Sequence, residues 1–211
     1  MAEPDPSDAE RRARLTEADL RRADATVRLA WGQLPAAHRE LLEEIGASHW
    51  RVVNEPLGSV VDGLLRSGGH PGLSPADRLW MDKALAVWIG PLRLMVLDGG
   101  HRLMEELDET AYEWFVCNNA WHEWGHALSI GLCSAEDIAA GRRLLELAPE
   151  GIRESIRKGG YRSSQYTHEL VANVYALLMI RRRQDLLDRP QWLNEEIYEL
   201  VERVTGWTER E

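Results

Sequence analysis

One stretch of the sequence has residue types and a spacing that could hold a metal ion and activate water. Residues 121–126 read Trp-His-Glu-Trp-Gly-His, with His122 and His126 four positions apart. On a helix, residues four apart lie on one face, so both imidazoles can bind the same ion. Neutral imidazoles suit Zn²⁺, which makes a bound water acidic. Glu123 follows the first ligand directly and is the predicted general base.

The same pattern has a structural interpretation, because two histidines on a helix can lie at the surface or form a satisfied pair in a core. A helix that is buried on several faces does not readily carry two histidines and a carboxylate without a use for them. We therefore favour the metal interpretation, since the flanking residues are mostly apolar: Phe115, Val116, Ala120, Ala127, Leu128 and Ile130.

A catalytic zinc site needs a third protein ligand and keeps one position open. Residues 167–176 read Thr-His-Glu-Leu-Val-Ala-Asn-Val-Tyr-Ala, a helical pattern. Glu169 and Asn173 share one face of this helix, which makes Glu169 the predicted third ligand. Asn173 is predicted to hold a ring N–H of a zinc histidine. His168 points about 100° away from Glu169 and is the alternative ligand.

An electrophilic group that stabilises the transition state is also expected near such a centre. Three residues just before or at the second motif are candidates: Tyr161, Tyr166 and His168. Loop tyrosines more often serve packing, so the choice among the three stays open.

Together the two motifs resemble the zincin metallopeptidases of the gluzincin type, and the second is locally similar to the ImmA/IrrE group of small intracellular zincins. The resemblance covers residues 108–183. It implies that His122, His126 and Glu169 are zinc ligands, that Glu123 is the general base, and that Asn173 supports a ligand.

The leading prediction is a zinc metallopeptidase that hydrolyses a peptide bond in a peptide or protein substrate. The first alternative is a non-catalytic regulatory or interaction protein on a zincin scaffold, which would not need Glu123. The second is a structural zinc site closed by four protein ligands, with His168 as the additional one. The number of protein ligands around the metal separates this last possibility from the first.

Composition narrows the possible partners and the location. The 211 residues are 44% hydrophobic and 28% charged, as in a globular protein, and the net charge of −10 argues against nucleic acid and anionic membranes as partners. No apolar stretch reaches the ~18 residues that a membrane span needs, and the acidic N-terminus is unlike a secretory signal. The two cysteines, Cys117 and Cys133, imply no disulfide framework. A cytoplasmic location is expected, and the oligomeric state is left open.

Local signals predict an α+β fold that is mostly helical with a small sheet, and residues 92–97 are the predicted strand. The resemblance implies a zincin-like domain in which this sheet lies beside the active-site helix. It also implies that residues 92–97 form an edge strand, where an extended peptide can add as another strand. Prolines, glycines and capping residues predict helices over residues 17–32, 35–46, 76–86, 108–130, from 134, 164–183 and 194–204. The predicted caps are Thr16, Ser74, Ser134 with Asp137 three residues later, and Asn194.

The predicted organisation has three parts. Residues 1–12 are polar, with two prolines and many charges, and are expected to form a disordered tail. Residues 13–48 are expected to form N-terminal helices packed on the main domain. Residues 49–211 are expected to form the zincin-like domain.

Overall fold

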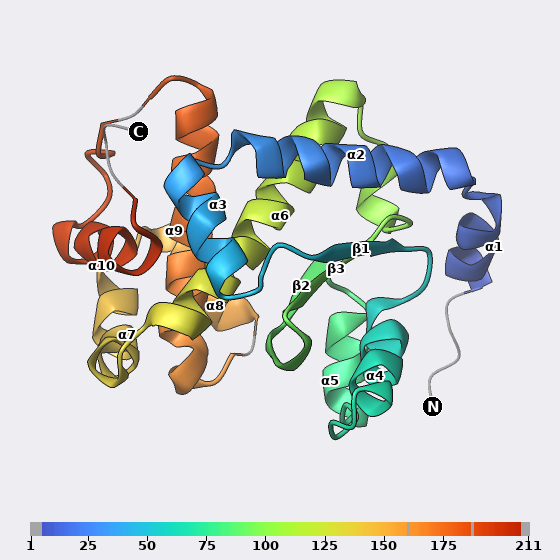
Figure 1. Ribbon diagram of the computed structural model, residues 1–211, viewed down its shortest axis with the longest axis horizontal. Coiled ribbons are helices and arrows are strands. Elements are labelled where there is room, and N and C mark those ends of the chain that lie inside the picture. The colour runs from blue at the N-terminus through green and yellow to red at the C-terminus, as the bar shows by residue number, and fades with distance from the viewer. Residues whose placement is uncertain (1–5, 160, 187, 208–211) are drawn as a thin grey trace. The chain divides into compact units, whose positions relative to one another are not determined.

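The computed structural model describes residues 6–159, 161–186 and 188–207 (Figure 1). It is mainly helical with a small mixed sheet, which confirms the predicted α+β class. The chain forms two compact units, Met1–Gly32 with Ser48–Ala120, and Gln33–Ala47 with Trp121–Glu211. Within the described ranges, no helix is both long enough and apolar enough to cross a membrane.

The first unit alternates helices with short strands. In chain order its elements are α1 (Pro6–Arg14), α2 (Glu17–Gln33), β1 (Trp50–Val53), α4 (Leu57–Ser67), α5 (Pro75–Met81), β2 (Ala86–Ile89), β3 (Leu94–Asp98) and the first half of α6 (Glu109–Leu132). Capping hydrogen bonds begin two of these helices as predicted. The Thr16 hydroxyl accepts from Asp19 N at 3.3 Å, and the Ser74 hydroxyl accepts from Asp77 N at 3.1 Å.

The sheet has the strand order β1–β3–β2, with β1 parallel and β2 antiparallel to β3. The prediction of a sheet-edge strand at residues 92–97 is therefore wrong, because β3 is the middle strand and both of its edges are hydrogen-bonded. Leu92 lies in a 3₁₀ turn, Gly90–Leu92. The strand is buried at Met95, Val96, Leu97 and Asp98, as expected of a strand covered on both faces.

Helix α4 covers one face of this sheet. The apolar residues of α4 that face it are Leu57, Val61 and Leu65, and they pack with Val53, Val87, Ile89 and Val96 from the strands. The helix predicted over residues 76–86 is too long, since α5 ends at Met81 and Ala86 begins β2. Local pattern did not separate this buried four-residue strand from the helix before it.

The N-terminal segment is helical where a disordered tail was predicted. Residues 6–12 belong to α1 and are not a disordered tail, whereas residues 1–5 lie outside the described part. Arg12 places two hydrogen bonds on Asp98, Nη1 to Oδ1 at 2.8 Å and Nη2 to Oδ2 at 2.7 Å. Asp98 is fully buried at the end of β3. One charged residue of this segment, Arg12, therefore forms an ion pair with a residue far away in the sequence. Composition alone does not reveal such a pair.

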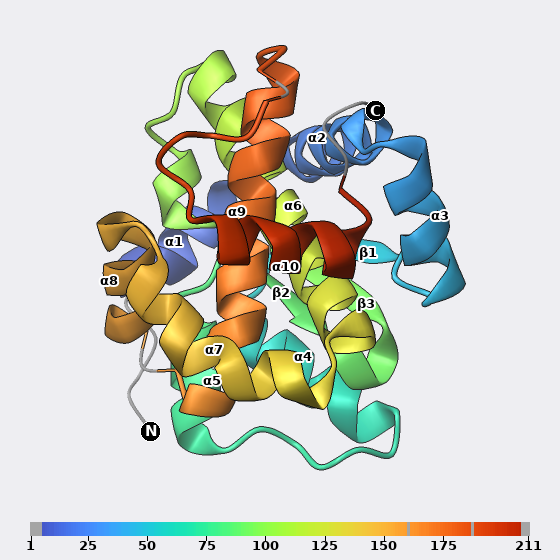
Figure 2. The ribbon, with the colours of Figure 1, turned by 90° about the vertical axis from the view of Figure 1, so that its left-hand side faces the viewer.

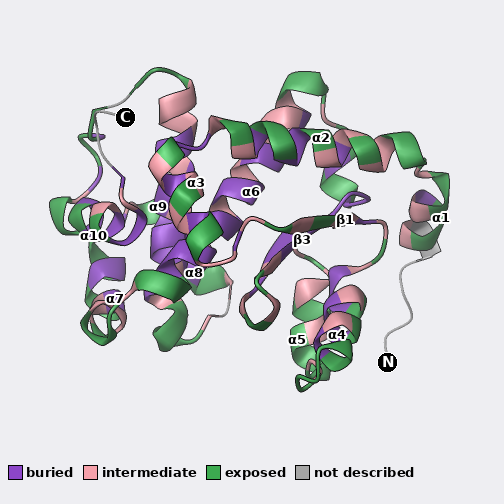
Figure 3. Ribbon diagram, viewed as in Figure 1, coloured by how far each residue is buried: buried purple, intermediate pink, exposed green. Residues whose placement is uncertain are grey.

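The second unit is built around α9 (Tyr166–Arg183). The other elements are α3 (Ala36–Glu44), the second half of α6, α7 (Ala135–Leu147), α8 (Glu150–Lys158) and α10 (Glu195–Thr205). Helices α7, α8 and α10 all contact α9 (Figure 2). Buried residues occupy much of α9, including Leu170, Val171 and Tyr175 (Figure 3). The second predicted motif thus lies on the central helix of this unit.

The two units do not follow the predicted division into residues 13–48 and 49–211. Helix α2 belongs almost entirely to the first unit, whereas α3 belongs to the second. The sheet belongs to the first unit, and His122, Glu123 and His126 belong to the second. The expected place of the sheet beside the active-site helix stays a prediction.

Candidate metal centre

A glycine in α6 permits the close approach of α6 and α9. A Cβ atom at Gly125 would lie 2.7 Å from Cα of Ala172 and 3.3 Å from the ring of Tyr175. Backbone cannot move aside as a flexible side chain can, so only glycine fits at this contact. Gly125 thereby sets the distance at which the histidine face of α6 meets α9.

Helix α7 fixes the first turn of α9. A capping box between Ser134 and Asp137 begins α7, as predicted. The buried Thr167 hydroxyl donates to the Asp137 carbonyl at 2.9 Å, and a Cβ atom at Gly141 would lie 2.2 Å from that hydroxyl. Glu169 follows Thr167 by two residues, so the contact between α7 and α9 positions its carboxylate.

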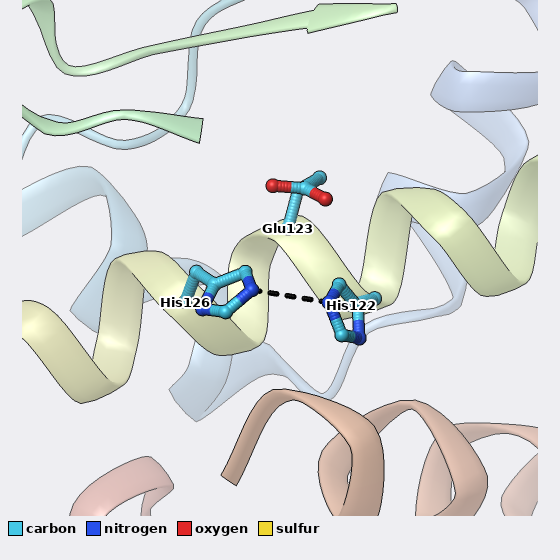
Figure 4. Close-up of side chains that lie close together, drawn as sticks. All are labelled: His122, Glu123 and His126. Atoms are coloured by element: carbon cyan, nitrogen blue, oxygen red, sulfur yellow. Dashed lines mark hydrogen bonds between the residues drawn. The ribbon is translucent and has the colours of Figure 1, made fainter. Parts of the chain in front are cut away.

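Three predicted ligands converge in the structure. The Nε2 atoms of His122 and His126 are 3.0 Å apart and face each other on one side of α6 (Figure 4). Glu169 Oε1 lies 3.4 Å from His126 Nε2, and Oε2 lies 3.8 Å from His122 Nε2. These distances to the carboxylate exceed those of good hydrogen bonds. The three groups therefore surround a common point.

Glu123 lies beside this point in a different direction. Its side chain projects from α6 away from the two facing imidazoles (Figure 4). One carboxylate oxygen and one ring nitrogen of each histidine nevertheless lie within 4.8 Å of one another. The Glu123 side chain is buried, with 7% of its surface exposed. This position suits a group that contacts a small molecule at the centre.

The spacing of the three ligands fits a tetrahedral zinc ion. Zinc bonds to nitrogen and oxygen of about 2.0–2.2 Å place neighbouring tetrahedral ligands about 3.3–3.6 Å apart. The separations are 3.0 Å between the imidazoles and 3.4 and 3.8 Å from them to the two different oxygens of Glu169, values that bracket this range. Two imidazoles and one carboxylate form a donor set that Zn²⁺ accepts in catalytic sites. The residues present therefore fit the metal that the sequence predicts.

Burial favours the uncharged forms of the ligands. It lowers the pKa of His122 to about 4. The pKa of His126 lies well below its ordinary value because of burial and because His122 and His168 would be like charges nearby. Burial, followed by the Glu123 carboxylate, raises the pKa of Glu169 to about 8. Both imidazoles are thus neutral near pH 7, the form in which they bind metals.

Tyr161 is the candidate helper that contacts the centre. Its hydroxyl forms a hydrogen bond with the Glu169 carboxylate, an interaction that favours the ionised carboxylate. Burial and the carboxylates of Glu169 and Glu123 raise the pKa of Tyr161, so the hydroxyl keeps its proton. Gly159 makes room for the ring, since a Cβ atom there would lie 2.3 Å from it.

The other candidates have different surroundings. His168 Nδ1 lies 3.1 Å from Ser129 Oγ, which in turn donates to the His126 carbonyl. The Asn173 amide donates to the Glu169 backbone carbonyl at 2.7 Å, and its predicted bond to a histidine ring stays a prediction. Tyr166 is the first residue of α9, and in the described part of the chain its hydroxyl forms no hydrogen bond with the centre.

Sequence reasoning missed the residues that assemble the centre. Gly125 in the middle of an apolar helix was the available signal, because an internal glycine often marks close packing of another backbone. The partnership of His168 with Ser129 left no signal in the local pattern. It depends on two helices that are far apart in the sequence meeting side by side.

Comparison with known proteins returned no match to a protein-family model, a curated protein or a solved structure. The resemblance to gluzincins and to the ImmA/IrrE group therefore rests on the two motifs themselves. The geometry of the centre is the other basis for a proposed function.

Proposed function

We propose that the protein is a zinc-dependent metallopeptidase that hydrolyses peptide bonds in a peptide or protein substrate. One observation carries this proposal. Two neutral imidazoles and a buried carboxylate from a second helix surround one point at zinc-ligand spacing, with a second buried carboxylate beside them. A structural zinc site requires no such extra carboxylate.

Each residue has a distinct role in the proposed reaction. His122, His126 and Glu169 would hold Zn²⁺, which when bound supplies Lewis acidity for polarising a carbonyl and activating water near neutral pH. Tyr161 holds the Glu169 carboxylate in place through its hydrogen bond. His168 is proposed to orient the α6 backbone through Ser129.

Glu123 is the proposed general base. Its carboxylate takes a proton from the attacking water and passes it to the departing amine, which must leave protonated. The Glu123 side chain is buried beside the two imidazoles, so it can reach a water molecule held at the centre. Its position next to a ligand, rather than at ligand spacing, leaves the carboxylate free for this task.

Glu123→Gln tests the proposal because it keeps the shape of the side chain and removes its basicity. We expect cleavage of a peptide library, followed by mass spectrometry, to fall by ~10²–10⁴-fold. Zinc content should stay at that of the wild type. Glu109→Gln is the matched control, since Glu109 is 81% exposed on the same helix and pairs with Arg22. It should leave cleavage unchanged.

Three results would redirect the proposal. Equal cleavage by wild type and Glu123→Gln would exclude this base, and failure to take up zinc would exclude the metal centre. Bound zinc without cleavage in either protein would favour the non-catalytic scaffold.

The proposed location is the cytoplasm, where Cys117 and Cys133, both present as thiols, would stay reduced.

A further inference from the structure

The first unit contains a cavity that has no part in the proposed metal centre. Its volume is about 460 Å³, within the range of small-molecule sites. Residues from α1, α2, the loop after β3 and the start of α6 form its wall. Three of the lining residues are arginines: Arg11, Arg14 and Arg22.

Arg11 is a buried cation whose hydrogen bonding is incomplete. Its side chain is 7% exposed, and Nη2 pairs with Asp8 on the same helix. The buried Nη1 atom has no hydrogen-bond partner in the described part of the chain. Burial and the neighbouring Arg12 lower the pKa of Arg11. A buried donor of a charged group is costly to leave without an acceptor.

Two further acidic groups of this region, Asp98 and Asp19, are committed to other partners. Asp98 accepts two hydrogen bonds from Arg12 and a third from Gly100 N at 2.9 Å. Asp19 lines the cavity, but one of its oxygens accepts from both the backbone N and the hydroxyl of Thr16, each at 2.8 Å. Their capacity to neutralise Arg11 is therefore reduced.

Two of the three lining arginines are paired with acids outside the cavity lining. Three arginines and two acids, Asp19 and Glu105, line the cavity, which gives the lining residues a formal balance of +1. Arg11 pairs with Asp8 and Arg22 pairs with Glu109. Arg14 forms no ion pair within the described ranges, and Arg14 and Glu105 are both exposed to solvent, where their fields are screened. The donors at this wall that the protein's own acids leave unsatisfied are therefore Arg14 and Nη1 of Arg11.

The cavity is also too large for a simple inorganic ion, and part of its wall is apolar. Leu15, the buried Met104 and the ring of Tyr112 supply this part. The Arg22 guanidinium lies 3.8 Å from the centre of the Tyr112 ring, which fixes the aromatic face.

The wall after β3 is tightly packed. A Cβ atom at Gly100 would lie 2.4 Å from Leu15 Cδ1, and one at Gly99 would lie 2.8 Å from Leu20 Cδ2. The loop therefore lies directly against the corner between α1 and α2. A wall held in this way is formed before a ligand arrives, which lowers the entropic cost of binding.

We propose that this cavity binds a small organic anion. Its carboxylate or phosphate group accepts hydrogen bonds from Arg11 and Arg14, and its body packs against Leu15, Met104 and Tyr112. Guanidinium groups bind both kinds of oxyanion through charge-assisted hydrogen bonds. His101 also lines the cavity, but its ring nitrogens are engaged with Lys83 O and Leu103 N, so it adds no donor.

Isothermal titration of the full-length protein with benzoate and with phenyl phosphate, at constant ionic strength, tests this site. Benzyl alcohol is the neutral probe of similar shape. Zinc is first removed with the neutral chelator 1,10-phenanthroline, so that anions cannot bind at a metal. We expect one of the two anions to bind with 1:1 stoichiometry and benzyl alcohol to bind far more weakly. The tighter anion identifies the preferred head group.

Variants locate the binding. Arg11→Gln should raise the Kd about tenfold or more, because a hydrogen bond to a charged group contributes ~1.5–3 kcal/mol. Arg14→Gln should raise the Kd by a smaller factor. If Arg11→Gln does not fold, the Kd of Arg14→Gln decides whether the anion binds in this cavity. Arg21→Gln is the control, since Arg21 is 66% exposed on α2 and pairs with Glu17 outside this wall. Absence of binding by both anions, equal binding of benzyl alcohol, or an equal loss in Arg21→Gln would overturn the proposal.

Discussion

Asp98 and Glu169 are both buried carboxylates, yet their neighbours are of opposite kinds. Asp98, in the first unit, accepts two hydrogen bonds from Arg12 and one from Gly100 N. Glu169, in the second unit, lies among two neutral imidazoles and the Tyr161 hydroxyl. Burial, followed by the like charge of the Glu123 carboxylate, raises the pKa of Glu169 to about 8.

The difference separates a group that serves the fold from one suited to an external ion. Arg12 supplies the positive charge for Asp98 from within the chain, so this pair is complete without a ligand. The neighbours of Glu169 are donors to a metal and not cations themselves. A metal cation bound by Glu169 and the two imidazoles would supply the missing positive charge and stabilise the folded chain. Substitutions around the two carboxylates test this contrast.

The largest effect on stability is expected for Arg12→Met. This change leaves the Asp98 carboxylate buried without its counterion, which typically costs about 3–5 kcal/mol of unfolding free energy. Urea denaturation would measure the loss. Arg21→Met removes only an exposed pair with Glu17 and should cost less than about 1 kcal/mol. Similar losses in the two variants would mean that Asp98 does not depend on Arg12.

A buried neutral histidine in the second unit should make stability depend on pH. Burial, with a smaller effect from Arg182, lowers the pKa of His38 to about 4, and Nδ1 lies 2.9 Å from the Tyr175 hydroxyl. The unfolded chain, with a pKa near 6.5, binds the proton first as pH falls. The neutral His38 therefore contributes about 3 kcal/mol to the free energy of unfolding. This contribution is complete above about pH 6.5 and is lost progressively as the pH falls to about 4.

Urea denaturation of zinc-free wild type and His38→Phe, each at several pH values, isolates this effect. The difference in unfolding free energy between the two proteins should shrink as pH falls from 6.5 to 4. His122, His126 and Glu169 titrate in both proteins, so their contributions cancel in the comparison. A difference that stays constant over this range would contradict the assignment.

Zinc affinity should distinguish Glu169 from its neighbour. We expect Glu169→Gln to weaken zinc binding more than ~100-fold, since removing even an outer partner of a ligand costs ~10–100-fold. His168→Gln should weaken it much less, because His168 contacts Ser129. Competition with a chromogenic chelator measures both affinities. The opposite order would assign the metal to His168.

The smallest expected effect concerns the hydrogen bond to the third ligand. Tyr161→Phe should reduce zinc affinity about tenfold, because it removes the hydroxyl that positions the Glu169 carboxylate. Tyr166→Phe removes a hydroxyl at the start of α9, the helix that carries Glu169, and should leave zinc affinity unchanged. The same chelator competition applies, and equal affinities of wild type and Tyr161→Phe would show that the bond does not support the ligand.

Helix starts were predictable because their signals are local. The caps at Thr16, Ser74 and Ser134 lie within three residues of the backbone groups that they satisfy. Asn194 likewise begins α10 as predicted, its side chain accepting from Glu196 N at 3.0 Å. The strands were harder to predict, since β1 and β2 are four residues long and form their ladder hydrogen bonds with β3, which is distant in the sequence from β1.

The sequence by itself determined that His122 and His126 share a face and that Glu123 lies beside them, because the helical period alone dictates this arrangement. Tertiary structure decided that Glu169 meets both histidines while His168 turns to Ser129, and that Tyr161 reaches the carboxylate. It also brought Arg12 to Asp98 from a segment that composition assigned to a tail. These outcomes depend on contacts such as Gly125 against Ala172, where packing of distant segments, and no local preference, selects the partner.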